Sequence, residues 1–367
     1  RILVLLNGRQ VYLDYFGQVN WENIPVEMAE IKQVEVVKGP NTALFGFNAV
    51  SGVVNIITYN PLYDDVGQLD LRGGTNDLTE ASAVKTFKFG DRAGARISAG
   101  GFDAAEFEEY SDLYNIVEED VSRRSALIDT WFQLTDNVQF QFEASRNNYV
   151  RNEEIVTRTA SSVDYETTSI RGRILADTDL GLWEADVYHN GTRADIDLLL
   201  DVNTGNVAPF QFDNRVTVAK LNNTFKVGAD HIFRLGAEYR EGVNIVEGRG
   251  ALAGELDQGS DLENTIFGVS GLWDYSINPK WSSSVAVRFD TFDLNKDGPV
   301  NNRFVTTPGA SSVLTEEALD RQSRNEWSYN LGLVYEPTDK DTFRATAARG
   351  IDLPSFTEFG LQFIDTG

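Results

Sequence analysis

The chain lacks cysteine altogether, so neither a disulfide framework nor a thiolate metal site is possible. It also contains no run of about 18 apolar residues, which excludes a transmembrane helix. Basic residues are outnumbered: 32 Lys and Arg face 56 Asp and Glu, giving a net charge of −24. This balance argues against nucleic acid as a partner, because phosphate binding needs patches of Lys and Arg.

Motifs of enzyme chemistry are missing as well. The sequence has no GxSxG elbow, no HExxH and no P-loop, so we expect no enzyme activity, no catalytic residue and no cofactor. Its two histidines offer little. His189 is conceivable as a haem ligand, but a lone interfacial side chain is the favoured interpretation, and His231 is predicted in a short turn.

Two acidic segments raise the question of calcium. Residues 293–298 match the start of an EF-hand loop, but Phe304 occupies the position that needs a bidentate acid. Residues 106–120 carry seven carboxylates, which could bind a cation or simply solvate a loop. A solvated surface loop is the favoured interpretation in both cases, so no metal site is predicted.

What the sequence does contain is period-two alternation of apolar and polar residues from about residue 67 onward, as in residues 138–145, 233–240 and 327–336. One face of each strand is apolar and the other carries full charges, as expected for a strand between two different media. A soluble sandwich would alternate too. Tyrosines near strand ends, among them Tyr149, Tyr165, Tyr188 and Tyr275, predict an interfacial girdle.

The links between these strands separate the two architectures. Short links such as residues 135–137 and 228–230 take turns with long ones such as 103–123 and 293–324. A meandering transmembrane β-barrel has short turns at one rim and long loops at the other, whereas Greek-key sandwiches do not show this rhythm. We therefore predict an antiparallel barrel with about thirteen strands present, the last near residues 342–351, and a final loop at residues 363–367.

The N-terminal segment is a separate unit. Short strands are predicted at residues 3–6 and 11–13 around the turn pair Asn7-Gly8, and longer ones at residues 31–38 and 53–58. The stretch VEVVKGPNTALFGFNAVSGVVNIIT resembles the plug domain of TonB-dependent outer-membrane receptors, and LGLVYEPTDKDTFRATAARGIDLPSFTEFG resembles their late barrel hairpin. Departures from the family pattern include Lys38 for Arg and Phe47-Asn48 for small residues.

The resemblance implies a fold and a function. Residues 1–62 would be the C-terminal half of a small α+β plug, and residues 63–367 the N-terminal part of a barrel of 22 strands. The protein would lie in the bacterial outer membrane, bind a ferric siderophore or cobalamin-like chelate at its external loops and plug, and import it with TonB-coupled energy. Its partners would be the TonB complex, the ligand, and outer-membrane lipid and lipopolysaccharide. We expect the chain to be a piece of a longer protein, with a TonB-binding peptide and further strands outside it.

The resemblance also suggests site residues. The stretch at residues 12–18 corresponds to an outward-facing apex of the plug, where aromatic and amide side chains suit a large polar ligand. The predicted substrate-binding residues are Tyr12, Tyr15, Phe16, Gln18 and Asn20. Lys38 matches the plug arginine that pairs with barrel carboxylates, and Glu238 is one possible partner.

Two other functions remain open. A passive, substrate-selective porin would conduct without TonB and would lack a folded plug. A soluble β-rich binding or enzymatic domain would show a polar outer surface. The sequence identifies neither the ligand nor the oligomeric state.

Overall fold

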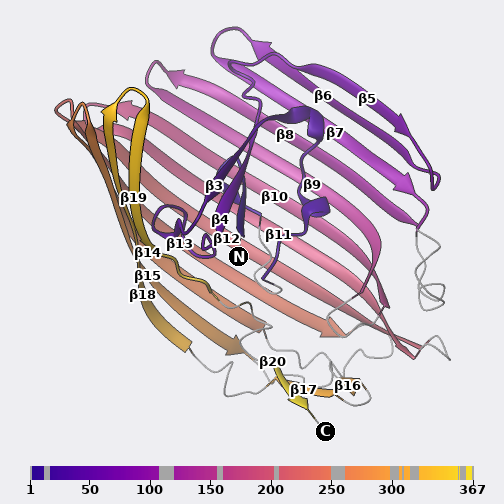
Figure 1. Ribbon diagram of the computed structural model, residues 1–367. Helices are drawn as coiled ribbons and strands as arrows, with labels where there is room; N and C mark the ends of the chain where they lie inside the picture. The colour runs from indigo at the N-terminus through magenta and orange to yellow at the C-terminus, as the bar shows by residue number, and fades with distance from the viewer. Residues whose placement is uncertain are drawn as a thin grey trace.

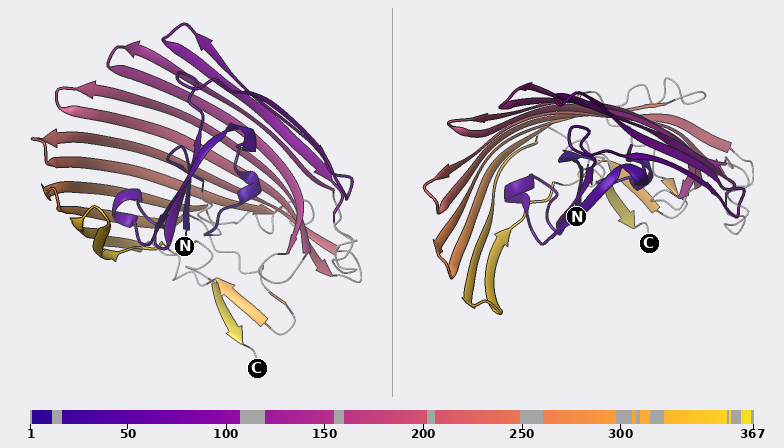
Figure 2. Two further views of the ribbon diagram at one scale, coloured as in Figure 1. Left: turned by 45° about the horizontal axis from the view of Figure 1, so that its top comes forward. Right: turned by 90° about the horizontal axis from the view of Figure 1, so that it is seen from above.

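The computed structural model describes residues 2–11, 17–106, 120–154, 160–201, 206–248, 261–297, 306–307, 310–314, 322–353, 355 and 361–365. Its dominant element is one antiparallel sheet of thirteen strands, which bends around a small N-terminal unit (Figures 1 and 2). Within this sheet each strand pairs with the next one along the chain, except that β15 pairs with β18 because β16 and β17 belong to a separate small sheet, so the predicted thirteen-strand meander is confirmed. The strands in order are β5 (Gly67–Gly73), β6 (Thr79–Phe89), β7 (Ala93–Ala104), β8 (Val121–Thr135), β9 (Val138–Glu154), β10 (Ala160–Thr178), β11 (Gly181–Asp201), β12 (Asn206–Val227), β13 (His231–Gly248), β14 (Asp261–Asn278), β15 (Trp281–Asp297), β18 (Gln322–Thr338) and β19 (Asp341–Arg349).

The polarity of this sheet is the reverse of that in a soluble protein. On β13, Leu235 and Tyr239 are 52% and 43% exposed on the convex face. The intervening Glu238 and the neighbouring Arg240 are buried on the concave face, toward the N-terminal unit. Charged side chains are buried only when paired, so the concave face must supply partners, while the convex face suits an apolar medium. The alternation seen in the sequence therefore divides lumen from lipid.

A charge on the convex face gives the first testable prediction. Leu235→Arg is expected to destabilise the folded barrel by about 2–4 kcal/mol, because arginine would lie at membrane depth. Ile277→Arg, on the same face at the short-turn rim, is the matched control and should cost about 0–1 kcal/mol. Reversible folding into lipid vesicles measures both, and equal costs at the two positions would contradict a lipid-facing surface.

The N-terminal unit is a four-stranded sheet in the order β2-β1-β4-β3. Its strands are β1 (Ile2–Leu6), β2 (Arg9–Gln10), β3 (Ile31–Lys38) and β4 (Gly52–Thr58), with short helices η1 (Trp21–Asn23), η2 (Met28–Glu30) and α1 (Thr42–Phe45). Strands β3 and β4 lie where the sequence predicted them, but β2 occupies residues 9–10 instead of 11–13. The reason is that Asn7 and Gly8 both adopt positive φ, which makes a two-residue turn and pairs Leu6 with Arg9.

A short segment joins β4 to the thirteen-stranded sheet. At the first position of β4, Gly52 adopts a backbone conformation and a close approach that suit glycine. Its φ is +159°, and a Cβ there would lie 2.7 Å from the carbonyl oxygen of Val37.

No helix among the described residues is long and apolar enough to cross a membrane.

Several predicted loops are in fact strand. A long link was expected at residues 194–213, but β11 continues to Asp201 and β12 begins at Asn206. The two strands extend beyond the membrane because, when paired, they satisfy each other's backbone hydrogen-bonding groups. The terminal stretch expected to be a loop contains β20 (Leu361–Asp365), which pairs with β17 (Ala310–Leu314), itself next to β16 (Thr306–Thr307).

The prediction that these tyrosines form an interfacial girdle is partly wrong. Tyr149, Tyr165 and Tyr188 are 5%, 2% and 1% exposed on the concave face, since they share the parity of inward-facing polar residues. Tyr275 does face outward near the short-turn rim, where it stacks on His231 with ring centroids 4.5 Å apart.

Candidate functional site

The contact surface between the N-terminal unit and the concave wall is the candidate site. Arg9, on β2, reaches the wall at two points: its Nη2 lies 3.1 Å from Glu143 Oε1, and its Nη1 donates to Asn190 Oδ1 at 2.7 Å. The side chains of Arg9 and Glu143 are only 2% and 1% exposed. A buried ion pair with this geometry is costly to break, because either charge alone would be stranded away from water.

The rest of the β1–β2 turn is bound in the same way. The Gln10 backbone N–H donates to the Tyr188 hydroxyl at 3.4 Å, and Asn190 Nδ2 donates to the Gln10 carbonyl at 3.0 Å. Arg240 donates to the Gln10 side-chain oxygen from β13. Three residues earlier, the Asn7 carbonyl accepts a hydrogen bond from Arg171 at 2.9 Å. The turn therefore bridges β9 to β13.

This turn separates two cavities. On the side of the short turns lies a cavity of about 620 Å³, the lower cavity, bounded by Asn7 and Gly8 of the turn. Toward the long loops lies a smaller one of about 40 Å³, bounded by Arg9 and Val11. We call the latter the amide pocket, since its lining includes four asparagines of the wall and the N-terminal unit, among them Asn20.

The partition between the cavities is thin. On β11, Asp186 lines the lower cavity, Tyr188 meets the turn and Asn190 lines the amide pocket. These are successive inward-facing residues, so the partition spans roughly 13 Å along the strand. Neighbouring strands repeat this order, with Arg171 below and Thr167 above on β10, and Lys220 below and Val216 above on β12.

A second group of contacts holds the other side of the unit to β7 and β8. Arg96, fully buried, places its Nε 3.2 Å from Glu30 Oε2 and donates to Thr58 Oγ1 at 2.6 Å and to the Tyr59 carbonyl. Nearby, Arg123 Nη1 lies 2.8 Å from Glu27 Oε1. Burial raises the pKa of Glu30 above its ordinary value, although Arg96 and the hydroxyl of Ser98 oppose the rise.

The raised pKa of Glu30 predicts a pH effect. Because the folded state holds this proton more tightly than the unfolded chain does, the stabilisation it gives is complete below the ordinary pKa of 4.5 and is lost as the pH rises through the folded value. Glu30→Gln, which cannot titrate, should flatten the fall in stability over that window. Denaturant unfolding at a series of pH values measures this, with the exposed Glu35→Gln as control. An unchanged profile in Glu30→Gln would contradict it.

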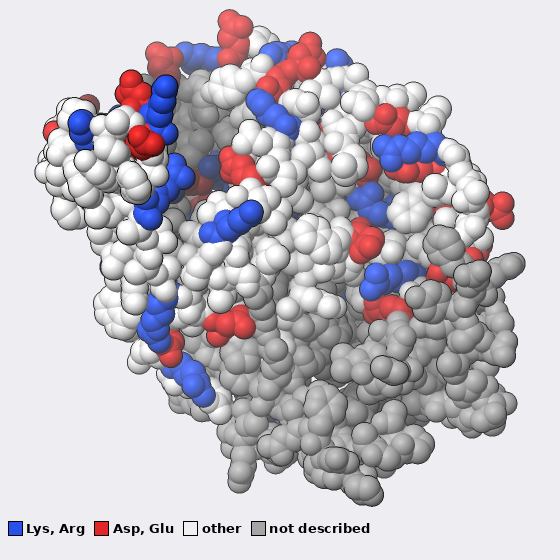
Figure 3. All heavy atoms as spheres, viewed as in Figure 1, with Lys and Arg blue, Asp and Glu red and all other residues white. Residues whose placement is uncertain are grey.

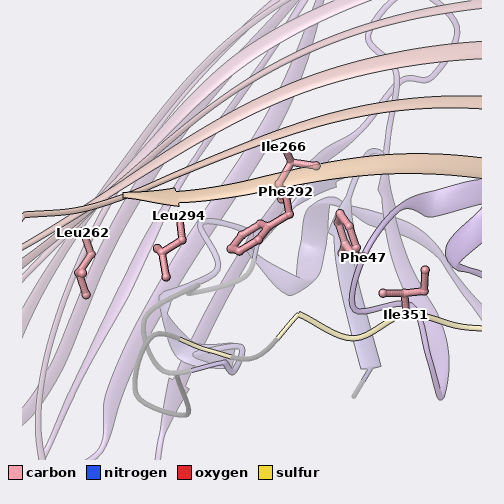
Figure 4. Close-up of a cluster of buried hydrophobic side chains, with 6 residues drawn as sticks. All are labelled: Phe47, Leu262, Ile266, Phe292, Leu294 and Ile351. Atoms are coloured by element: carbon pink, nitrogen blue, oxygen red, sulfur yellow. The ribbon is translucent and has the colours of Figure 1, made fainter. Parts of the chain in front are cut away.

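The segment 40–50 is held by apolar contacts. Phe47, 6% exposed, packs among Ile266, Phe292 and other wall side chains, as Figure 4 shows. The segment that follows β19 joins this cluster through Ile351, whose backbone N–H donates to Thr42 Oγ1 at 3.1 Å. Asn48, at φ +71°, accepts from the backbone N–H of Leu353 at 3.2 Å. The unusual Phe47-Asn48 pair therefore has a docking role.

The predicted site residues are distributed unevenly. Tyr12, Tyr15 and Phe16 lie outside the described residues. Gln18 is exposed, and Asn20 lines the amide pocket. The prediction that these residues bind substrate stays a prediction.

The structure does not bring Lys38 and Glu238 together among the ion pairs of the described part of the chain. Lys38 is exposed at the end of β3, whereas buried Glu238 lies 3.3 Å from Arg288 Nη2 within the wall. Among the described residues, Arg9 is the cation of the N-terminal unit that forms a buried pair with a carboxylate of the thirteen-stranded sheet. Its position in a two-residue strand between polar turn residues gave no sequence signal.

The remaining sequence candidates find other roles. His189 points outward next to Thr217, with Nδ1 2.9 Å from its Oγ1. His231 begins β13, instead of lying in the turn, and accepts from Trp273 Nε1. Asp293 and Asn295 lie in β15, an extended conformation that an EF-hand loop does not have, and most of the acidic segment 106–120 lies outside the described residues. Within the described part, no cluster of three potential metal ligands occurs.

Comparison with known proteins now gives these features a family. The model for the TonB dependent receptor-like β-barrel matches residues 40–366, and that for the TonB-dependent receptor plug domain matches residues 1–53. A vitamin B12 transporter, BtuB, of Vibrio vulnificus strain YJ016 is 25% identical over an alignment covering 97% of this chain and 52% of the relative. BtuB of strain CMCP6 is 32% identical over 30% of this chain and 18% of that protein.

Solved structures show the same fold at low identity. The copper transporter OprC matches with a TM-score of 0.71 at 14% identity, covering 96% of this chain and 55% of that one. The siderophore receptor PiuA of Acinetobacter baumannii matches with a TM-score of 0.69 at 15% identity, covering 97% and 58%. The chain thus spans about half the length of a BtuB relative that it matches almost throughout. It belongs to the TonB-dependent receptor family of outer-membrane proteins, with a plug held against a β-barrel wall.

Proposed function

We propose that this chain forms the gate and part of the wall of an active importer, which binds a scarce nutrient such as a ferric siderophore or cobalamin-like chelate and takes it up with TonB-coupled energy. Relatives named as vitamin B12 transporters and a siderophore receptor support this class. In this proposal residues 1–62 are the plug and residues 63–367 the wall.

The observation that carries the proposal is the partition. The β1–β2 turn closes the space between the amide pocket and the lower cavity along β9 to β13, and it does so with a buried ion pair and several hydrogen bonds. A solute on this side of the plug can pass only when those bonds break. Breaking them needs work, which suits an energised gate and does not suit a passive porin.

The convex face supports a lipid setting, and we propose lipopolysaccharide as a neighbour. Arg124, Arg146 and Arg193 are exposed on outward-facing positions toward the long-loop end of β8, β9 and β11. Each lies beside a carboxylate. In this proposal the arginines bind the phosphate groups of lipopolysaccharide, and the carboxylates bind the cations that bridge those phosphates.

Nutrient-limited growth tests the proposed transport. Deleting the gene for the full-length receptor should slow growth under limiting iron or under limiting vitamin B12, and loss of TonB should reproduce the same defect. Restoration by the full-length gene is the control. Uptake that continues at the same rate after the proton-motive force is collapsed would favour the passive porin instead.

A further inference from the structure

The amide pocket contains polar atoms that lack partners. Asn23 Nδ2 and Asn20 Oδ1 are buried without a hydrogen-bond partner among the described residues. Asn20 stands at the N-cap of η1, where an asparagine side chain ordinarily caps the helix, yet it makes no capping bond here. A buried donor or acceptor without a partner destabilises the protein, so these atoms are suited to a partner from outside.

The unmet groups form a complementary set. Asn23 offers a donor while its Oδ1 is already used by Asn147 Nδ2 at 2.8 Å, and Asn20 offers an acceptor. A carboxamide or a hydroxyl both donates and accepts, so it satisfies the two atoms together. The volume of about 40 Å³ admits one such group.

Charge on this side of the plug limits the ligand further. Among the described residues, three arginines on this side are bound to carboxylates: Arg9 to Glu143, Arg123 to Glu27, and Arg151 to Glu153. Acidic and basic side chains are intermixed over the plug side of the molecule in Figure 3. An anionic chelate needs unpaired cations, and this site offers neutral amides and paired charges instead.

The wall above the pocket is apolar and aromatic. Tyr149, Tyr165 and Phe212 gather there on β9, β10 and β12 with smaller aliphatic side chains. These three side chains are at most 5% exposed, so the polar atoms of the pocket, and not this cluster, would meet a ligand.

We propose that the amide pocket binds a carboxamide or hydroxyl group at the edge of an uncharged ligand, so that the receptor is selective for neutral over anionic molecules. This inference rests on the proposed import function and names the class of its substrate.

Binding to the full-length receptor in detergent, measured by isothermal titration calorimetry, tests the assignment. Three probes separate the chemistries: vitamin B12 for carboxamides, maltoheptaose for hydroxyls, and a ferric tris-catecholate complex as the anion. One neutral probe is expected to bind, and the ferric complex is not. Binding of the ferric complex alone, or of no probe, would overturn the proposal.

Pocket variants then localise the site. Asn20→Leu removes the acceptor without costing a described partner, and should weaken the neutral probe roughly threefold to tenfold. Asn23→Asp keeps the bond from Asn147 and replaces the donor by an acceptor, so it should weaken the same probe at least as much. Gln68→Leu, exposed on β5, is the matched control. Unchanged affinity in both pocket variants of the folded protein would place binding elsewhere.

Uptake distinguishes this inference from the proposed function. If cells import a ligand in a TonB-dependent way but that ligand is anionic, the pocket assignment fails and the importer stands. If uptake needs no TonB, the importer itself fails.

Discussion

An Arg9→Ala receptor is expected to leak. Removal of the guanidinium leaves the Glu143 carboxylate, which is 1% exposed, buried without its charged partner. It also removes the hydrogen bond to Asn190. Breaking a buried pair on one side costs roughly 3–5 kcal/mol, which a two-residue strand cannot absorb. The β1–β2 turn should then leave the wall part of the time, and the amide pocket and lower cavity should join. Planar-bilayer conductance and sensitivity of cells to a large hydrophilic antibiotic, both without TonB, measure the leak.

Two controls separate this effect from general damage. Lys32→Ala breaks an ion pair with Asp64 in which the lysine is 47% exposed. This variant should lose at most about 1 kcal/mol of stability and should not leak. Arg9→Met combined with Glu143→Leu removes both charges together and should recover much of the lost stability. Wild-type conductance in Arg9→Ala, with unchanged hydrogen exchange at residues 4–11, would show that the turn is not the partition.

Phe47→Ala is expected to loosen the opposite side of the plug. The side chain fills a cluster with Leu262, Leu294 and other wall residues, and truncating a buried phenylalanine costs about 3–5 kcal/mol. The loss should fall on docking of the segment 40–50, because most of the cluster belongs to the wall. Hydrogen exchange of that segment and the thermal midpoint measure it.

Leu44→Ala, on the adjacent helix α1 and 39% exposed, provides the comparison and should cost far less. Equal exchange rates in the two variants would mean that the cluster does not hold the plug.

The sequence predicted the repeating parts of this structure well. Strand number, the positions of β3 and β4, and the polarity of the two sheet faces follow from period-two alternation, which is a local property. Even the misplaced tyrosines could have been read correctly, since Tyr149 has the parity of Gln141 and Glu143, both of which face the lumen.

The site could not be predicted in the same way. The amide pocket joins Asn20 and Asn23 of the plug to Asn190 and Asn214 of two barrel strands, and only the strand register and the seating of the plug bring them to one level. The pairing of Arg9 with Glu143 spans 134 residues, and many other carboxylates on inward-facing positions were equally eligible. Resemblance to the family pointed to Lys38, whereas contact geometry selects Arg9.

The two sets of plug contacts also differ in when they can form. Arg96 meets Tyr59 only 37 residues away along the chain, whereas Arg240 meets Gln10 across 230 residues, and Asn330 meets Pro40 across 290. Closing a long loop takes longer than closing a short one, so the anchor on β7 can form while the later strands are still unpaired. The plug would then be tethered at one side before the wall that completes its seat exists. We therefore expect assembly to proceed from Arg96 toward β13 and β18, with the β1–β2 turn secured late.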